Sequence, residues 1–299
     1  MVDRGEGPWP SSNLESLVVP WLVSRLHGVE PSERSAMSRR LLENVSGKTR
    51  GERLTEEMRW SESQLDRLAL LAEKLNEGRP LQYVLEEAWF DGFKLYVSSA
   101  VLIPRPETEE LVMAMVNKLE HEHVGDALKV LDWCTGSGCM ALSLKRRLPA
   151  TEVHGYDVSE EAIQVAKKNA ADCNVVLRLE VADLLLSDSP NSPFDAVMSN
   201  PPYIPGSERT TMHGRVTHHE PELALFVPDD DPLVFYVALE RWCKRGGLKS
   251  KGWLGVECHA RFAEDVASLF RCAGGWKHVE ILEDMQGLSR HVIARLDLT

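Results

Sequence analysis

Short apolar runs alternate with amphipathic segments from residue 128 to the end of the chain. The strand-like runs are 128–133, 152–158, 175–181, 194–199, 253–257, 279–282 and 291–296. The segments 140–148, 160–171, 233–243 and 261–272 carry apolar residues at helical spacing. Strands that alternate with helices build a doubly wound, Rossmann-like sheet. We therefore predict an α/β fold with a mostly parallel seven-stranded sheet, and a ligand site at the carboxyl ends of its strands.

The first part of the chain has a different pattern, because apolar residues recur at helical spacing throughout residues 13–76. The first apolar stripe is interrupted by Pro20, a second helix is predicted to begin at Pro31, and Ser61 precedes a third. A Gly-Arg-Pro sequence then ends the helical pattern. Residues 1–80 are thus predicted to form a small helical domain without catalytic residues, whose use is to hold a partner.

The segment that links the two patterns predicts a β-hairpin. Asp91-Gly92 lies between aromatic runs within residues 81–104, which is typical of a tight hairpin turn. Pro106 suits the first turn of a helix that we expect to reach about Leu119. Arg105 lies between two prolines and is expected to be rigidly held. The remaining domain is predicted to span residues 105–299.

Composition and charge restrict the functional classes. The chain of 299 residues is 43% hydrophobic, and its formal net charge is −12. A protein that binds nucleic acid usually needs a basic surface, so we expect no direct nucleic-acid partner. No apolar run approaches the roughly 20 residues that span a bilayer, so no membrane partner is expected.

The cysteines and the N-terminus indicate a compartment. The six cysteines are scattered without a Cys-x-x-Cys pair, which favours reduced thiols and gives no zinc site. Asp3 and Glu6 precede any apolar segment, which argues against a secretory signal, and no organellar transit peptide is evident. We expect a cytoplasmic or organellar protein, mitochondrial or plastid, that is not secreted.

Asn200-Pro201-Pro202-Tyr203 follows the apolar run 194–199 directly. Two prolines stiffen the backbone here and leave neighbouring carbonyls without local partners. The Asn200 side-chain carbonyl and the Pro201 carbonyl could accept both hydrogens of an –NH2 group, and the Tyr203 ring could lie flat against a planar group. On this motif alone, a proline-rich turn without chemical function is an equally good interpretation.

Three further strand ends carry candidate cofactor ligands. The first strand-to-helix turn is Asp132-Trp133-Cys134-Thr135-Gly136-Ser137-Gly138, where glycines let the backbone approach a ligand. Asp157 ends the next strand, where an acid commonly accepts from ribose hydroxyls, and Asp183 ends the third and could hold an adenine amino group. A dinucleotide is one candidate, weakened by an incomplete glycine fingerprint. Each acid alone is better explained as a helix cap, but together they match an S-adenosylmethionine site.

These motifs resemble a known family. The loop 132–139, the Asn-Pro-Pro-Tyr-Ile-Pro sequence at 200–205 and the Ile-Pro-Arg-Pro-Glu-Thr-Glu sequence at 103–109 resemble the protein-(glutamine-N5) methyltransferases that modify peptide chain release factors, the HemK/PrmC family. Residues 78–83 and 220–225 also match stretches typical of it. The resemblance covers roughly residues 62–297.

The resemblance implies a class I methyltransferase fold, with S-adenosyl-L-methionine as cofactor and a release factor as protein substrate. The methyl group goes to the side-chain amide of the Gln in a Gly-Gly-Gln motif, and we expect a monomer. The catalytic and substrate-binding residues implied are Asn200, Pro201, Pro202 and Tyr203. The cofactor residues implied are Asp132, Cys134, Thr135, Gly136, Ser137, Gly138, Asp157, Asp183, Leu184 and Asn200.

The chain also departs from the family pattern. Trp133-Cys134 stands where Leu-Gly is commoner, and Leu184 stands where an aromatic is often found against the adenine. The segment 205–228 is divergent, and His213, His218 and His219 fit no standard metal-ligand spacing, so a mobile, solvated lid is expected there. A nucleic-acid adenine-N6 methyltransferase and a catalytically silent binding module remain as alternatives.

Overall fold

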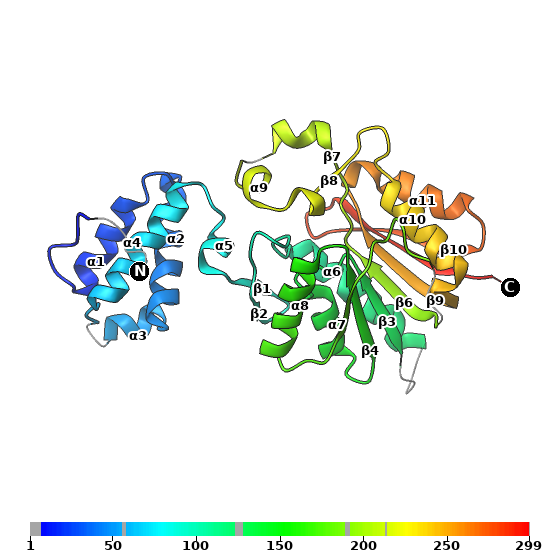
Figure 1. Cartoon of the computed structure of the whole chain (residues 1–299), viewed down its shortest axis with the longest axis horizontal. Helices are drawn as coiled ribbons and strands as arrows, with labels where there is room; N and C mark the ends of the chain where they lie inside the picture. Colours follow the sequence, from blue (N-terminus) through cyan, green and yellow to red (C-terminus); the bar gives the residue numbers. More distant parts are fainter. Residues whose placement is uncertain (1–6, 56–57, 123–127, 189–191, 213, 299) are drawn as a thin grey trace. The chain divides into compact units, whose positions relative to one another are not determined.

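A computed structural model of the chain describes residues 7–55, 58–122, 128–188, 192–212 and 214–298. The fold divides into two compact units (Figure 1). The helical unit comprises residues 1–87 and 213–219, and the sheet unit comprises residues 88–212 and 220–299. Each unit has a hydrophobic core of its own, so each is described separately.

The helical unit is built from short helices around one core of leucines and valines. Its helices are α1 (Glu15–Arg25), α2 (Pro31–Ser46), α3 (Arg50–Thr55), α4 (Glu62–Asn76), α5 (Leu81–Leu85) and α9 (Gly214–His219). The sequence pattern predicted α2 and α4 where they lie, and it missed α3. The hydroxyl of Ser61 caps α4 by accepting from the backbone N–H of Gln64.

Pro20 lies inside α1 and does not interrupt it, contrary to expectation. Proline cannot donate to the carbonyl of Ser16, four residues earlier. Both residues are exposed, so that carbonyl is open to solvent. The apolar stripe of α1, which includes Val18 and Leu22, is fully buried and holds the helix against the core.

The sheet unit contains the predicted seven-stranded sheet, in the order β10-β11-β9-β6-β3-β4-β5. Its strands are β3 (Lys129–Trp133), β4 (Glu152–Asp157), β5 (Arg178–Val181), β6 (Phe194–Ser199), β9 (Leu248–Glu257), β10 (Trp276–Glu283) and β11 (Ser289–Leu296). Neighbouring strands from β5 to β9 pair in parallel, whereas β11 pairs antiparallel with β9 and β10. Chain order reverses at β3, which places β3, β4 and β6 side by side in the centre.

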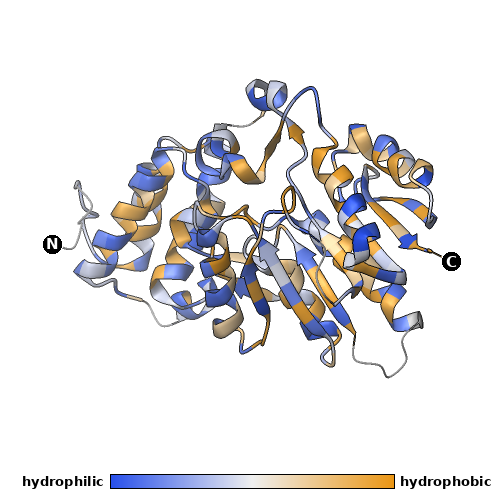
Figure 2. Ribbon diagram, turned by 45° about the vertical axis from the view of Figure 1, so that its right-hand side comes forward, coloured by the Kyte–Doolittle hydropathy of each residue, from blue (hydrophilic) through white to orange (hydrophobic). Residues whose placement is uncertain are grey.

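Helices cover both faces of the sheet (Figure 1). One face packs against α6 (Pro106–Glu122), α7 (Cys139–Arg147) and α8 (Glu160–Asp172). The other packs against α10 (Val234–Trp242) and α11 (Ala263–Cys272). Strands covered on both faces are expected to be buried, and β3 and β6 are buried along most of their length. Hydrophobic and hydrophilic residues are mixed along the strands of the sheet (Figure 2).

The predicted hairpin joins the sheet unit. Strands β1 (Ala88–Phe90) and β2 (Phe93–Leu95) pair antiparallel around Asp91. The Asp91 carboxylate accepts from Ser143 and Arg147 on α7, and its backbone N–H donates to Glu109 on α6. The boundary between units lies after Glu87 and not after residue 80, because α5 buries its apolar residues in the helical core.

The segment 205–228, predicted as a mobile, solvated lid, contains short elements of regular structure. Strands β7 (Ile204–Pro205) and β8 (Phe226–Val227) pair in parallel and close the segment at its base. Two short 3-10 turns, at Gly206–Thr211 and Glu222–Ala224, lie between these strands. Within the helical unit, Arg215 of α9 forms an ion pair of 2.9 Å with Glu33. His213 lies outside the described residues.

No helix in the described ranges is both long enough and apolar enough to cross a membrane.

Candidate active site

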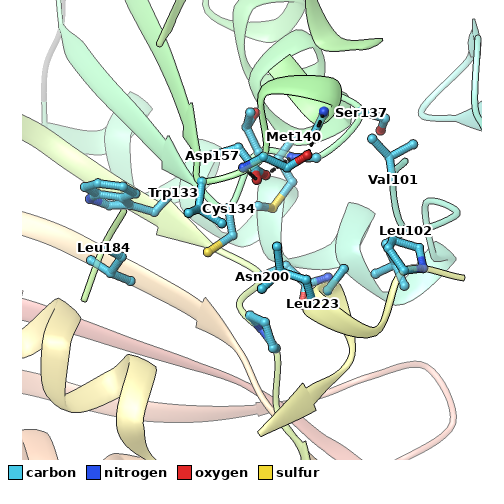
Figure 3. A pocket seen from close by; sticks show the side chains of 18 of the residues that line it. Val101, Leu102, Trp133, Cys134, Ser137, Met140, Asp157, Leu184, Asn200 and Leu223 are labelled. Carbon is cyan, nitrogen blue, oxygen red and sulfur yellow. Dashed lines mark hydrogen bonds between the residues drawn. The ribbon is translucent and has the colours of Figure 1, made fainter. Parts of the chain in front are cut away.

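A pocket in the sheet unit opens at the carboxyl ends of β3, β4 and β6 (Figure 3). Its walls come from segments far apart in the chain: residues 100–108, 133–140, 157–162, 182–185, 200–202, 221–224 and Phe235. Parallel strands end at one edge of a sheet, and the reversal of strand order beside β3 leaves room for a ligand there. The predicted strand-end residues thus meet at one cavity.

The loop after β3 turns sharply around this cavity. Gly136 and Gly138 have φ angles of 53° and 79°, which lie in the left-handed region that glycine adopts without strain. Cys134 is also left-handed, with φ of 59°, although a cysteine carries a Cβ that disfavours this conformation. The family pattern has glycine at this position, and the backbone geometry explains that preference. Burial raises the pKa of the Cys134 thiol, so the thiol is neutral.

Asp132 does not line the pocket, and its side chain holds the loop after β3. Its Oδ2 accepts a hydrogen bond of 2.7 Å from the Thr135 hydroxyl and one of 3.2 Å from the Ala141 N–H. Burial raises the pKa of this carboxyl to about 7. The sequence placed Asp132 among the cofactor residues. In the structure its hydrogen bonds instead hold the turn between Thr135 and α7.

Asp157 reaches the pocket from the end of β4. Its Oδ2 accepts from the Gly136 N–H at 2.9 Å, and its Oδ1 accepts from the Ser159 N–H at 3.0 Å. A hydrogen bond from the Val158 N–H also lowers the pKa of this carboxyl. The two oxygens have about four lone-pair sites between them, so at least one acceptor position is left for a ligand hydroxyl. Burial raises the pKa of Asp157, because the charged form loses hydration.

The third strand end forms the far part of the pocket. Asp183 and Leu184 both line it, and Oδ1 of Asp183 accepts from the Leu185 N–H at 2.8 Å. Leu184 is buried and packs in the same core as Trp133 (Figure 3). The Trp133 indole N–H is buried and has no hydrogen-bond partner in the described part of the chain. This part of the pocket combines the apolar side chains of Leu184 and Trp133 with the carboxylate of Asp183, as ligand pockets commonly do.

The Asn-Pro-Pro-Tyr segment contributes its first and third residues to the pocket wall. Asn200 and Pro202 line the cavity, while Pro201 and Tyr203, both described, lie outside its lining. The Asn200 Nδ2 donates to the Thr108 hydroxyl at 3.2 Å, so its Oδ1 is left for other partners. The Tyr203 hydroxyl donates to Glu257 at 3.0 Å, and its ring packs edge-on to His259.

The opposite wall is held by a buried carboxylate. Glu220, which is 4% exposed, accepts from the Ile103 N–H at 3.1 Å and from the Arg105 guanidinium at 2.6 Å. The rigid Arg105 that the sequence predicted is thus fixed by a charged partner as well as by its flanking prolines. The two bonds attach the residues before α6 to the segment that begins at Glu220.

Sequence reasoning missed several residues that shape the site. Thr108 and Glu257 form a buried hydrogen bond of 2.6 Å behind Asn200. The Asn169 side chain on α8 donates to the carbonyls of Ser137 and Tyr96, and it accepts from the Tyr96 N–H. Glu257 gave a sequence signal, because it is a polar residue at the end of the strand-like run 253–257, and such residues need partners once buried. Thr108 lies between Glu107 and Glu109 and gave no such signal.

The described cysteines and histidines form neither a disulfide nor a metal site. All six cysteines lie in described segments and are free thiols. Across the described ranges, no three His, Cys, Asp or Glu side chains converge as metal ligands do.

Comparison with known proteins identifies relatives of this chain. Residues 110–220 match the family model "Methyltransferase small domain". The chain is 36% identical over 219 residues to the release factor glutamine methyltransferase of Flavobacterium psychrophilum, covering 73% of this chain and 76% of that protein. It is 37% identical to the enzyme of the same name from Chlorobaculum tepidum, covering 72% and 74%.

Solved structures match at the level of the fold. The hMettl16 catalytic domain, solved in complex with MAT2A 3′UTR hairpin 1, superposes with a TM-score of 0.54 at 14% identity, covering 87% of this chain and 91% of that one. A second structure of that domain, with hairpin 6, gives a TM-score of 0.53 at 16% identity, covering 78% and 82%. At this identity the likeness supports the methyltransferase architecture and says nothing of substrate.

Proposed function

The chain belongs to the family of release factor glutamine methyltransferases, and from this premise we propose that it methylates the side-chain amide of a glutamine in a peptide chain release factor. The observation that carries the proposal is the position of Asn200. It lines the same pocket as the cofactor loop and Asp157, at the end of the strand next to β3. The glutamine proposed is that of a Gly-Gly-Gln motif, as the resemblance to the family implies.

The pocket fits S-adenosyl-L-methionine, the cofactor of this family. The buried Ser137 hydroxyl lines it without a hydrogen-bond partner among the described residues, as expected of a group that binds a polar ligand. We assign Ser137 and the loop 134–138 to the amino-acid part, Asp157 to the ribose hydroxyls, and Asp183 with Leu184 to the adenine. When bound, the cofactor supplies an electrophilic methyl group.

On the substrate side, we propose that Asn200 accepts a hydrogen bond from the amide –NH2 of the glutamine. An amide nitrogen is a weak nucleophile, because its lone pair is delocalised into its carbonyl. Acceptors fixed beside its hydrogens stabilise the positive charge that develops on that nitrogen and hold it in one place. The Pro201 carbonyl is proposed as the second acceptor, and Pro202 and Tyr203 as residues that shape the binding surface.

A labelling experiment tests this function directly. The protein is incubated with methyl-labelled S-adenosylmethionine and a release factor, and the labelled peptide is located by mass spectrometry. We expect one label on the glutamine of Gly-Gly-Gln and none on a release factor with that glutamine replaced by glutamate. Duplex DNA and RNA hairpins serve as parallel substrates. Label on nucleic acid alone would favour the adenine methyltransferase instead.

We also propose a partner-binding unit, an oligomeric state and a compartment. We propose that the helical unit holds the body of the release factor, and that the protein acts as a monomer without binding nucleic acid or membranes. Its formal charge of −12 supports the absence of a nucleic-acid partner. The proposed compartment is one in which translation takes place: the cytoplasm, a mitochondrion or a plastid. Light scattering and imaging of a fluorescent fusion test these two points.

A further inference from the structure

At the pocket wall, four side chains form one hydrogen-bond chain. The Asn200 Nδ2, at the end of β6, donates to the Thr108 Oγ1 at 3.2 Å. Thr108, in the first turn of α6, donates to the Glu257 Oε2 at 2.6 Å, and Glu257 ends β9. The second oxygen of Glu257 accepts from the Tyr203 hydroxyl at 3.0 Å.

The middle of this chain is closed off from solvent. Thr108 is 2% exposed and Glu257 is 1% exposed. Buried polar atoms that lose their partners carry the full cost of desolvation, so each hydrogen in the chain is restricted to one arrangement. Asn200 and Thr108 both line the pocket, where Asn200 lies beside Pro202, while Glu257 lies outside the pocket lining.

The chain has a direction, set by its carboxylate end. When Glu257 is ionised, both of its oxygens accept, so the single hydroxyl hydrogen of Thr108 is committed to Glu257. Burial raises the pKa of this carboxyl, and the hydrogen bonds from Thr108 and Tyr203 lower it. The Thr108 oxygen then has only lone pairs to offer Asn200. It can therefore bond the –NH2 half of the Asn200 amide but not its carbonyl oxygen.

We propose that Thr108 and Glu257 are positioning residues that fix which half of the Asn200 amide faces the substrate. The two halves of an asparagine amide have nearly the same shape, so packing alone does not choose between them. With Nδ2 bound to Thr108, Oδ1 is the half available to a substrate. A reversed amide would present N–H groups to the N–H groups of a glutamine amide, and no hydrogen bond could form.

This inference rests on the proposed function, because it concerns how Asn200 meets an –NH2 group. It extends that function by assigning a role to a threonine and a glutamate that act through Asn200. It also explains the position of Thr108 in the segment Pro106-Glu107-Thr108. The first turn of α6 brings a hydroxyl to the back of Asn200, and 92 positions in the chain separate the two residues.

The test compares Thr108→Val, which keeps the shape but removes the hydroxyl, with Thr108→Ser, which keeps the hydroxyl. We expect Thr108→Val to lower the single-turnover methylation rate on the order of tenfold to a hundredfold, as losing an outer partner of a functional side chain does. Affinity for S-adenosylmethionine should stay unchanged, and Thr108→Ser should retain most of the rate. Thr151→Val is the matched control. Thr151 is 3% exposed, but it lies directly before β4, at the end of the strand away from the pocket. It should behave as the parent.

A double-mutant cycle separates positioning from general damage. If Thr108 acts only through Asn200, adding Thr108→Val to Asn200→Ala should lower the rate no further. The same loss in both backgrounds, or a parental rate for Thr108→Val, would overturn the inference. If the valine variant does not fold, Thr108→Ala carries the same expectations.

A readout without turnover keeps this inference separate from the proposed function. In ¹⁵N-labelled protein, the Asn200 side-chain –NH2 signals are identified by their loss in Asn200→Ala. Thr108→Val should shift them and speed their exchange with water, whereas Thr151→Val should not. A parent that labels no glutamine refutes the proposed function, while unmoved Asn200 signals refute the positioning role.

Discussion

Arg105 donates a hydrogen bond of 2.6 Å to Glu220, although 115 positions separate the two residues in the chain. The Glu220 side chain is almost fully buried, while a third of the Arg105 side chain remains exposed. The same carboxylate accepts from the Ile103 N–H, so one side chain fixes the pocket wall that precedes α6. The stability of that wall therefore depends on one buried charge.

Glu220→Gln is expected to destabilise the protein and to impair methylation. The amide keeps one acceptor but loses the charge that Arg105 requires, which costs about 1–3 kcal/mol for a charge-assisted hydrogen bond. Urea unfolding measures this loss. Glu222→Gln is the matched control, because Glu222 pairs with Arg209 at an exposed position, and surface pairs contribute little. Equal stability of the two variants would contradict the role given to Glu220.

Asp157→Ala is expected to weaken S-adenosylmethionine binding by about ten- to a hundredfold, the worth of one charge-assisted hydrogen bond. The variant removes the acceptor assigned to the ribose and also frees the Gly136 N–H. Isothermal titration measures the affinity. Asp172→Ala, on the exposed end of α8, is the control and should bind as the parent. Parental affinity in a folded Asp157→Ala protein would refute the assignment.

Asn200→Ala is expected to leave cofactor affinity nearly unchanged and to lower turnover on the order of a hundredfold, as for one lost preorganised partner. Asn200→Asp should fall between this variant and the parent. It keeps an acceptor, but its second oxygen meets the Thr108 oxygen, whose hydrogen is committed to Glu257. Single-turnover methylation of a release factor measures both. Full activity of Asn200→Ala would make Asn200 a structural turn residue.

Asp132 predicts a pH dependence of stability. Its pKa in the folded protein is raised from 3.8 to about 7, so the folded state holds a proton that the unfolded state has released. The contribution to stability is complete below the unfolded pKa and is lost as pH rises towards 7. Asp132→Asn cannot ionise, and its carbonyl can replace Oδ2 as acceptor. Its advantage over the parent should grow by about 2–3 kcal/mol between pH 5 and pH 7.5.

Urea unfolding without cofactor at these two pH values measures that difference. Comparing variant with parent isolates Asp132 from Asp157 and Glu257, whose pKa values burial also raises. A pH-independent difference between variant and parent would show that Asp132 titrates as an exposed acid.

Removal of residues 1–87 tests the role of the helical unit. The boundary after Glu87 keeps the hairpin that Asp91 attaches to α7. The pocket is lined entirely by residues 100–235, so cofactor affinity should be retained. Methylation of a short Gly-Gly-Gln peptide should persist, and methylation of the intact release factor should fall. A folded truncated protein that methylates the intact factor at full rate would exclude a partner-holding role.

The sequence by itself determined the order of strands and helices in the sheet unit, and with it the edge at which ligands bind. Strand ends are local features, since an apolar run followed by Asp157 or Asn200 marks the end of a buried strand wherever it pairs. The left-handed turn at Gly136 and Gly138 was predictable for the same reason, because glycine signals a conformation of its own residue.

Only the tertiary structure decided which side chains act together behind the pocket wall. Thr108 and Glu257 lie 149 positions apart, and they meet because β9 pairs with β6 while α6 packs across both. The partner of a buried polar group depends on strand order and packing, which no local pattern records. The same holds for Glu220, for the continuation of α1 through Pro20, and for the grouping of α9 with the helical unit. In each case, packing against segments distant in the chain outweighed the local conformational preference of the residues.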